Sequence, residues 1–99
     1  MNNFFSTAKA LVATVEREHY DDVAVVMVSA DMANKMNLDA VQNEIHKLYA
    51  GQCLTSKVEI MEQDTDEYEQ KVKNYMYPEN PHAVEKLQQE LGEIAVLNM

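Results

Sequence analysis

The stretch that decides the fold is VAVVMV at residues 23–28, six apolar residues without a break, four of them valine. Asp21 and Asp22 precede it, and the polar sequence Ser29-Ala30-Asp31 follows it. Valine-rich runs of this length between polar residues are typical of short buried β-strands. The run therefore predicts a strand over residues 22–29. A buried helix is the alternative, and the fold class depends on this choice.

Upstream of this run, apolar residues recur at helical spacing. They stand at i, i+1, i+4, i+7, i+8 and i+11, which places all of them on one face of an α-helix. The residues are Phe4, Phe5, Ala8, Leu11, Val12 and Val15. We therefore expect a helix over about residues 4–18.

Directly after the run, two polar residues mark the starts of helices. Ser29 can cap a short helix through Met36. Asp39, with glutamine three residues later, has the spacing of a capping box and predicts a helix over residues 40–50. Gly51 then stands where a helix commonly ends in the left-handed conformation.

A second strand and a further helix are predicted in the next segment. Val58 and Ile60 alternate with charged residues, which favours a strand over residues 57–62 with one solvated face. Asp64, with glutamate three residues later, repeats the capping box. The helix that it starts should end before Pro78.

The last predicted helix begins at Asn80 and Pro81, a cap followed by proline at the first helical position. Its apolar residues follow at 3–4–3 spacing and form a narrow seam of Val84, Leu87, Leu91 and Ile94. The seam either closes the monomer or pairs with its copy in a homodimer.

These elements predict one small acidic domain over residues 1–99. We expect an α+β fold dominated by helix, with about five short helices and a small two-stranded sheet at 22–29 and 57–62. The connection between the two strands is long enough for parallel pairing. If residues 23–28 are helical, the fold is an all-α bundle instead. Two glycines and two prolines leave few of the turns that a sandwich or barrel needs.

The charge of the chain is strongly negative and is concentrated in one short stretch. There are 17 acidic residues against 8 basic ones, a net charge of −9, and six of the eleven residues at 59–69 are acidic with no base among them. We expect this stretch to be a protein-binding site, with a solvated strand-to-helix junction as the alternative. The residues are Glu59, Glu62, Asp64, Asp66, Glu67 and Glu69.

No motif for a catalytic, cofactor or metal site is recognised. The stretch starting at Asp64 begins like a calcium loop, but its sixth and twelfth positions are Glu69 and Tyr75 in place of glycine and glutamate. Cys53 has no second cysteine, and the three histidines, His19, His46 and His82, have no common spacing.

A single cysteine, no signal peptide and an uncharged run of at most nine residues predict a cytoplasmic chain without a membrane span.

Residues 29–50 resemble a helix-turn-helix in outline, with small Ala33 on the first helix, a turn near Asn37 and an apolar stripe on the second. The second helix offers no arginine, and a charge of −9 opposes phosphate contacts, so we expect no direct binding of nucleic acid.

The first hypothesis is a non-enzymatic macromolecule-binding protein. It would be an acidic interaction module or inhibitor that acts on a basic surface of a partner protein, including a nucleic-acid-binding groove that it would occupy as a mimic. The alternatives are a DNA-binding regulator that uses residues 29–50 and an orphan enzyme.

Overall fold

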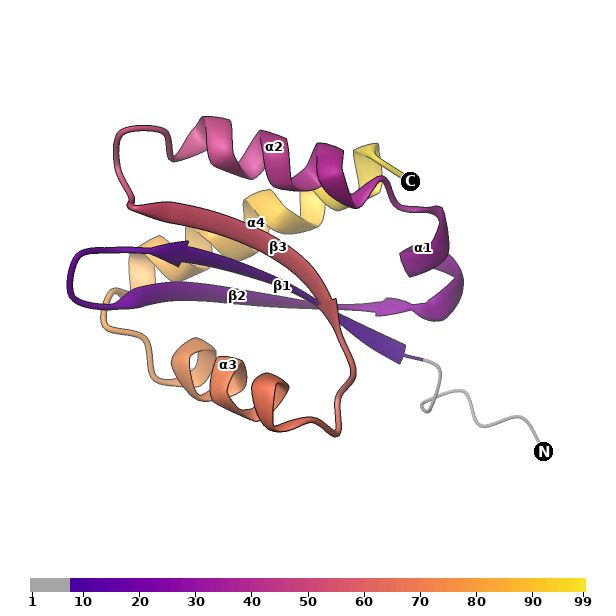
Figure 1. Cartoon of the computed structure of the whole chain (residues 1–99), viewed down its shortest axis with the longest axis horizontal. Coiled ribbons are helices and arrows are strands. Elements are labelled where there is room, and N and C mark those ends of the chain that lie inside the picture. Colours follow the sequence, from indigo (N-terminus) through magenta and orange to yellow (C-terminus); the bar gives the residue numbers. More distant parts are fainter. Residues whose placement is uncertain (1–7) are drawn as a thin grey trace.

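The computed structural model describes residues 8–99 and is built on a three-stranded antiparallel sheet (Figure 1). The strands are β1 (Ala8–Glu16), β2 (Asp21–Ser29) and β3 (Thr55–Met61), and their order in the sheet is β2-β1-β3. The strands expected over 22–29 and 57–62 are therefore present. They do not pair with each other, because β1 lies between them.

The helix predicted over residues 4–18 is wrong where it can be compared, because residues 8–16 form β1; residues 4–7 lie outside the described residues. Successive side chains of β1 enter two different cores. Since this central strand is covered on both faces, its buried positions 10–15 are all apolar except Thr14, and such a run also fits a helical stripe. One core takes Leu11, Ala13 and Val15, and the other takes Ala10 and Val12.

The sheet is also more extensive than predicted. β1 and β2 form a hairpin whose register runs from Ala8 opposite Ser29 to Glu16 opposite Asp21. Its turn is closed by Arg17, whose backbone N–H donates to the Tyr20 carbonyl at 2.8 Å. β3 pairs with the other side of β1, also antiparallel. The two-stranded sheet, its parallel pairing and the all-α alternative are therefore wrong, since β1 supplies a partner that needs no crossover.

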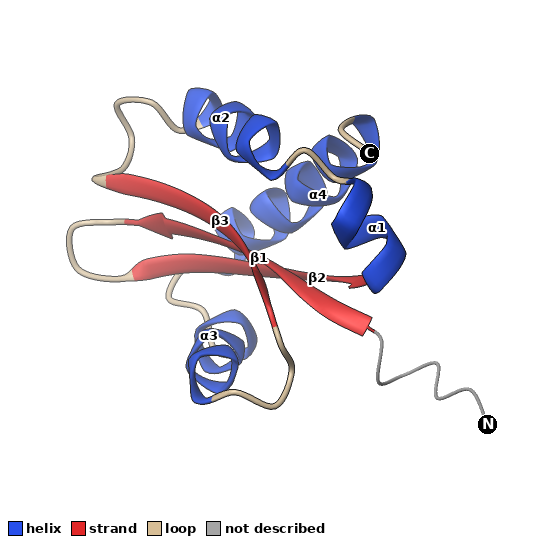
Figure 2. Ribbon diagram, turned by 45° about the vertical axis from the view of Figure 1, so that its right-hand side comes forward, coloured by secondary structure: helices blue, strands red, loops and turns tan. Residues whose placement is uncertain are grey.

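Helices cover both faces of the sheet (Figure 2). The described part of the chain contains four helices, not five, so the fold is α+β but not the helix-dominated arrangement expected. They are α1 (Ala30–Lys35), α2 (Leu38–Leu48), α3 (Asp66–Met76) and α4 (Pro81–Leu97).

The N-caps predicted at Ser29 and Asn80 are confirmed as the starts of α1 and α4. None of the four helices is long and apolar enough to cross a bilayer.

The two faces of the sheet differ in what covers them. α2 and α4 pack on the face that carries Leu11 and Val15, whereas α3 packs on the opposite face through Tyr68 and Tyr75. The sheet is therefore the middle of three layers. This arrangement explains why β1 carries no charged residue at its buried positions.

The remaining two helix starts were predicted one or two residues away from their true positions. Asn37, not Asp39, caps α2 and accepts from the Ala40 N–H at 3.1 Å. Thr65, not Asp64, caps α3 and accepts from the Tyr68 N–H at 3.2 Å. In both segments more than one residue is of a good capping type, so residue type alone does not decide between them.

Both edges of the sheet are met by a glutamine from a helix. On β2, the Val25 N–H donates to Gln88 Oε1 at 2.9 Å, and Gln88 Nε2 donates to the Val25 carbonyl at 2.6 Å. On β3, the Val58 N–H donates to Gln42 Oε1 at 3.0 Å. Unpaired edge groups would otherwise be open to another strand, so these side chains protect the edges.

The seam on α4 is used within the chain. Val84, Leu87 and Leu91 are buried, and Ile94 is partly buried against the same core. This core joins α4 to the sheet and to α2. A homodimer through the seam, which stays a prediction, would have to displace those contacts.

Candidate functional site

The predicted acidic stretch spans the end of β3, the connection that follows it and the first turn of α3. Four of its six carboxylates line one surface hollow together with Ile60, Met61 and Thr65, and we call this feature the acidic hollow. Asp64 and Glu69 do not line it, although both are exposed. The four carboxylates that the fold brings together are Glu59, Glu62, Asp66 and Glu67.

Two of these carboxylates are partly neutralised by lysines. Glu59 lies 3.7 Å from the Lys57 ammonium, and Glu62 is paired with Lys9 at 2.5 Å. The other four acidic residues of the stretch have no ion-pair partner within residues 8–99. Three of them stand in the first turn of α3, where the helix dipole favours negative charge. The charge that no lysine neutralises therefore lies at the α3 side of the acidic hollow.

A second hollow lies between α2 and α4, and sequence reasoning missed it. We call it the α2–α4 groove; it encloses about 400 Å³. In the sequence, each helix shows only a glutamate followed four residues later by an apolar residue, Glu44 with Leu48 and Glu90 with Ile94. Nothing in these local patterns indicates that the two helices are neighbours. The lining residues are Glu44, Lys47 and Leu48 from α2 and Glu90, Glu93 and Ile94 from α4.

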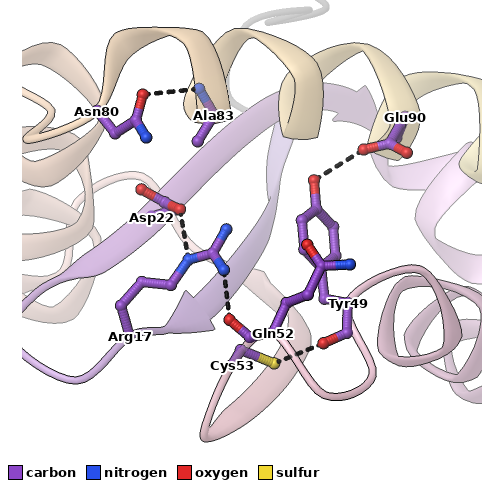
Figure 3. A network of polar contacts seen from close by, with 8 residues as sticks. All are labelled: Arg17, Asp22, Tyr49, Gln52, Cys53, Asn80, Ala83 and Glu90. Atoms are coloured by element: carbon purple, nitrogen blue, oxygen red, sulfur yellow. Dashed lines mark hydrogen bonds and ion pairs between the residues drawn. The ribbon is translucent and has the colours of Figure 1, made fainter.

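A polar network connects this groove to the hairpin (Figure 3). Arg17 Nε donates to Asp22 Oδ2 at 2.9 Å, and Arg17 Nη1 donates to the Gln52 carbonyl at 2.5 Å. The guanidinium carbon also lies 5.5 Å from the centre of the Tyr49 ring. The Asp22 side chain is only 2% exposed, so the cation balances a carboxylate that the fold has removed from water.

The network ends in the groove at Glu90. The Tyr49 hydroxyl donates to Glu90 Oε1 at 2.8 Å. Burial, followed by the hydrogen bond and the negative charge of Glu90, raises the pKa of the Tyr49 phenol above its ordinary value of about 10. Tyr49 therefore stays a neutral donor at physiological pH and orients the Glu90 carboxylate without cancelling its charge.

The residues considered for catalysis or metal binding lie on different elements. The Cys53 thiol donates to a backbone carbonyl at 3.4 Å, and His46 Nδ1 lies 3.0 Å from Ser56 Oγ on an exposed surface. His19 is in the hairpin turn, and His82 is at the start of α4. Among residues 8–99, no three His, Cys, Asp or Glu side chains converge in a way that could hold a metal ion.

The stretch that resembles a helix-turn-helix forms α1 and α2, which are joined by Met36 and Asn37. α2 packs on β3 and α4. It carries two carboxylates, Asp39 and Glu44, for its one lysine. This balance of charge opposes the phosphate contacts that a recognition helix needs.

The chain matches no protein-family model, and comparisons with curated proteins and with solved structures gave no match either. The fold and its surfaces define a small α+β domain with several carboxylate-lined hollows. The acidic hollow and the α2–α4 groove are two of them, and another adjoins the turn of the β1–β2 hairpin. What this protein does is therefore inferred from those surfaces.

Proposed function

We propose that the protein is a non-enzymatic binding module that docks through the acidic hollow onto a basic surface of a partner protein. The observation that carries the proposal is the gathering of Glu59, Glu62, Asp66 and Glu67 around one hollow, although they come from the end of β3, the connection after it and the first turn of α3. Asp64 and Glu69 add exposed charge beside it.

The electrostatics favour rapid encounter with a cation-rich surface. The whole chain carries a net charge of −9, so its field attracts a basic partner from any direction. At physiological salt that field is screened beyond about 8 Å. The final orientation therefore depends on the local carboxylates, and most of all on Asp64, Asp66, Glu67 and Glu69, which no lysine of the described chain neutralises.

The chemistry of this surface also suits inhibition. A partner groove that binds nucleic acid presents Lys and Arg side chains to the phosphates, and a group of carboxylates can occupy the same groove. In this form the protein acts as a nucleic-acid mimic. The lone thiol of Cys53, which is in no disulfide, supports placing this interaction in the cytoplasm.

The experiment compares two double variants that change the net charge equally. Asp66→Lys with Glu69→Lys alters the acidic stretch, and Asp39→Lys with Glu85→Lys alters exposed acids elsewhere. Asp66 and Glu69 both stand in the first turn of α3, and Asp39 stands in the first turn of α2, so the control reproduces the loss of favourable dipole interaction at one of its two positions. Each protein is immobilised as bait in a cell extract at low salt, and retained proteins are then purified and titrated directly.

We expect a partner that the wild type and the Asp39/Glu85 control retain, that the Asp66/Glu69 variant loses, and that high salt releases. Association with the purified partner should be about tenfold slower for the Asp66/Glu69 variant. Equal retention by the two variants would remove the acidic hollow from the interface. Submicromolar binding of duplex DNA at about 0.15 M salt would overturn the proposal in favour of a DNA-binding regulator.

A further inference from the structure

The α2–α4 groove combines an apolar floor with carboxylates along its sides. The apolar side chain of Leu48 is 45% exposed, and the partly buried Ile94 lines the same groove from α4. Leu97, one turn beyond Ile94, is 79% exposed and extends the apolar strip along α4. We propose that this groove binds a basic amphipathic helix of a partner protein. This surface is separate from the acidic hollow and does not depend on its role.

Polar contacts join α2 and α4 at both ends of the groove. At one end, Asn98 Nδ2 donates to Glu44 Oε2 at 2.8 Å, and the Asn98 carbonyl accepts from the Asn37 N–H at 2.8 Å. At the other end, the Tyr49 hydroxyl holds Glu90. The start of α2 therefore meets the end of α4, and the two helices run antiparallel. A groove fixed in this way needs little reorganisation to accept a ligand.

The charge of the groove selects a cationic ligand. Glu44, Glu90 and Glu93 line it against the single cation of Lys47, and none of the three glutamates is in an ion pair within the described chain. Their hydrogen-bond donors are neutral side chains, those of Asn98, Tyr49 and Gln89. Neutral donors orient a carboxylate but leave its charge available, so Lys or Arg side chains of a partner complete the site.

The backbone of the groove selects a helical ligand. α2 and α4 pair their own N–H and C=O groups internally, so the groove offers a ligand only side chains. An extended peptide would have no backbone partner there, whereas a helix satisfies its own backbone groups. A third helix can therefore lie in the groove with one apolar side chain against Leu48 and Ile94 and with cations reaching the glutamates on each side.

The test uses two synthetic peptides of about 18 residues made from leucine, lysine and alanine. In the first, the leucines stand at i, i+3, i+4 and i+7, so that they share one helix face flanked by lysines. The second has the same composition, with the leucines spread around the helix. Affinity is measured by calorimetry, and the circular dichroism of each mixture reports whether the peptide becomes helical on binding.

Two pairs of variants distinguish binding in the groove from binding that depends only on the net charge or only on exposed apolar surface. Glu93→Lys lies in the groove, and Glu85→Lys makes the same change at another exposed position on α4. Leu48→Ser lies in the groove, and Leu54→Ser changes a leucine that is 65% exposed elsewhere. All four positions are exposed, so the variants should fold, which circular dichroism checks.

We expect the amphipathic peptide to bind at least about tenfold more tightly than its permuted control and to gain helix when bound. Glu93→Lys and Leu48→Ser should each weaken binding about fivefold or more, and their matched controls less than about twofold. Equal affinity for the two peptides, equal effects of paired variants, or binding without helix would each overturn the proposal. A wild-type dimer in light scattering that Leu48→Ser dissociates would do so too, since the occupant would then be a second copy.

Discussion

At the scale of single residues, the buried ion pair of Arg17 and Asp22 gives a prediction about stability. Removing the carboxylate with Asp22→Ala leaves a partly buried guanidinium without its counter-charge, and its side chain is only 20% exposed. We expect the free energy of unfolding to fall by about 3 kcal/mol. Denaturation by urea measures the change.

Asp21→Ala, one residue earlier and outside this pair, serves as the control and should cost less than about 0.5 kcal/mol. The double variant Arg17→Ala with Asp22→Ala should cost less than the sum of the single changes, because each single variant leaves one charge uncompensated. Additive costs would show that the two side chains do not stabilise each other.

The raised pKa of the Tyr49 phenol should make the free energy of unfolding depend on pH in alkaline solution. Because burial raises the pKa of its phenol in the folded state, the unfolded chain loses this proton at about pH 10 while the folded chain keeps it. The unfolded state then binds fewer protons, so this contribution to stability is present below about pH 10 and declines above it.

Tyr49→Phe removes this ionisation. At pH 7 the variant should be less stable by about 1 kcal/mol, because it lacks the hydrogen bond to Glu90. The difference between the wild type and the variant should shrink as the pH rises above about 10. A difference in unfolding free energy that stays constant from pH 7 to about pH 11 would contradict the raised pKa.

At the scale of elements, the edges of the sheet depend on side chains of the helices. Gln88→Ala deprives the Val25 N–H and carbonyl of their partners. We expect unfolding to become easier by about 1–2 kcal/mol. Self-association should also increase, because the β2 edge becomes available to another strand. Urea denaturation and light scattering over micromolar concentrations measure the two effects.

Gln89→Ala is the matched control, since this exposed neighbour on α4 makes only a 3.5 Å contact with Glu93. The control should change neither property. A Gln88→Ala protein as stable and as monomeric as the control would show that β2 does not need this protection.

At the scale of the whole molecule, the excess of negative charge should make stability depend on salt. With a net charge of −9, repulsion between carboxylates exceeds the attraction within the few exposed ion pairs, such as Lys35 with Asp31 at 3.2 Å. Adding sodium chloride to about 0.5 M should raise the unfolding free energy by on the order of 1 kcal/mol. Chloride is used because sulfate stabilises proteins in general. A fall in stability with salt would mean that the ion pairs outweigh the repulsion.

Several features of this protein follow from the sequence alone because they depend on local physics. The valine-rich run predicted β2, since β-branched side chains favour a strand over a helix. Ser29 and Asn80 predicted the starts of α1 and α4, because a cap needs only its own side chain and the next three residues. The acidic composition is likewise independent of folding.

Other features were decided only by the tertiary structure. β1 is a strand because β2 and β3 bond it on both sides and helices cover both its faces. The spacing of its own apolar residues gives no sign of these partners. The α2–α4 groove exists because Asn37 meets Asn98 and Tyr49 meets Glu90 across more than forty residues of chain. Local preference cannot specify contacts between distant segments, because burial in a shared core contributes more free energy than helix or strand propensity.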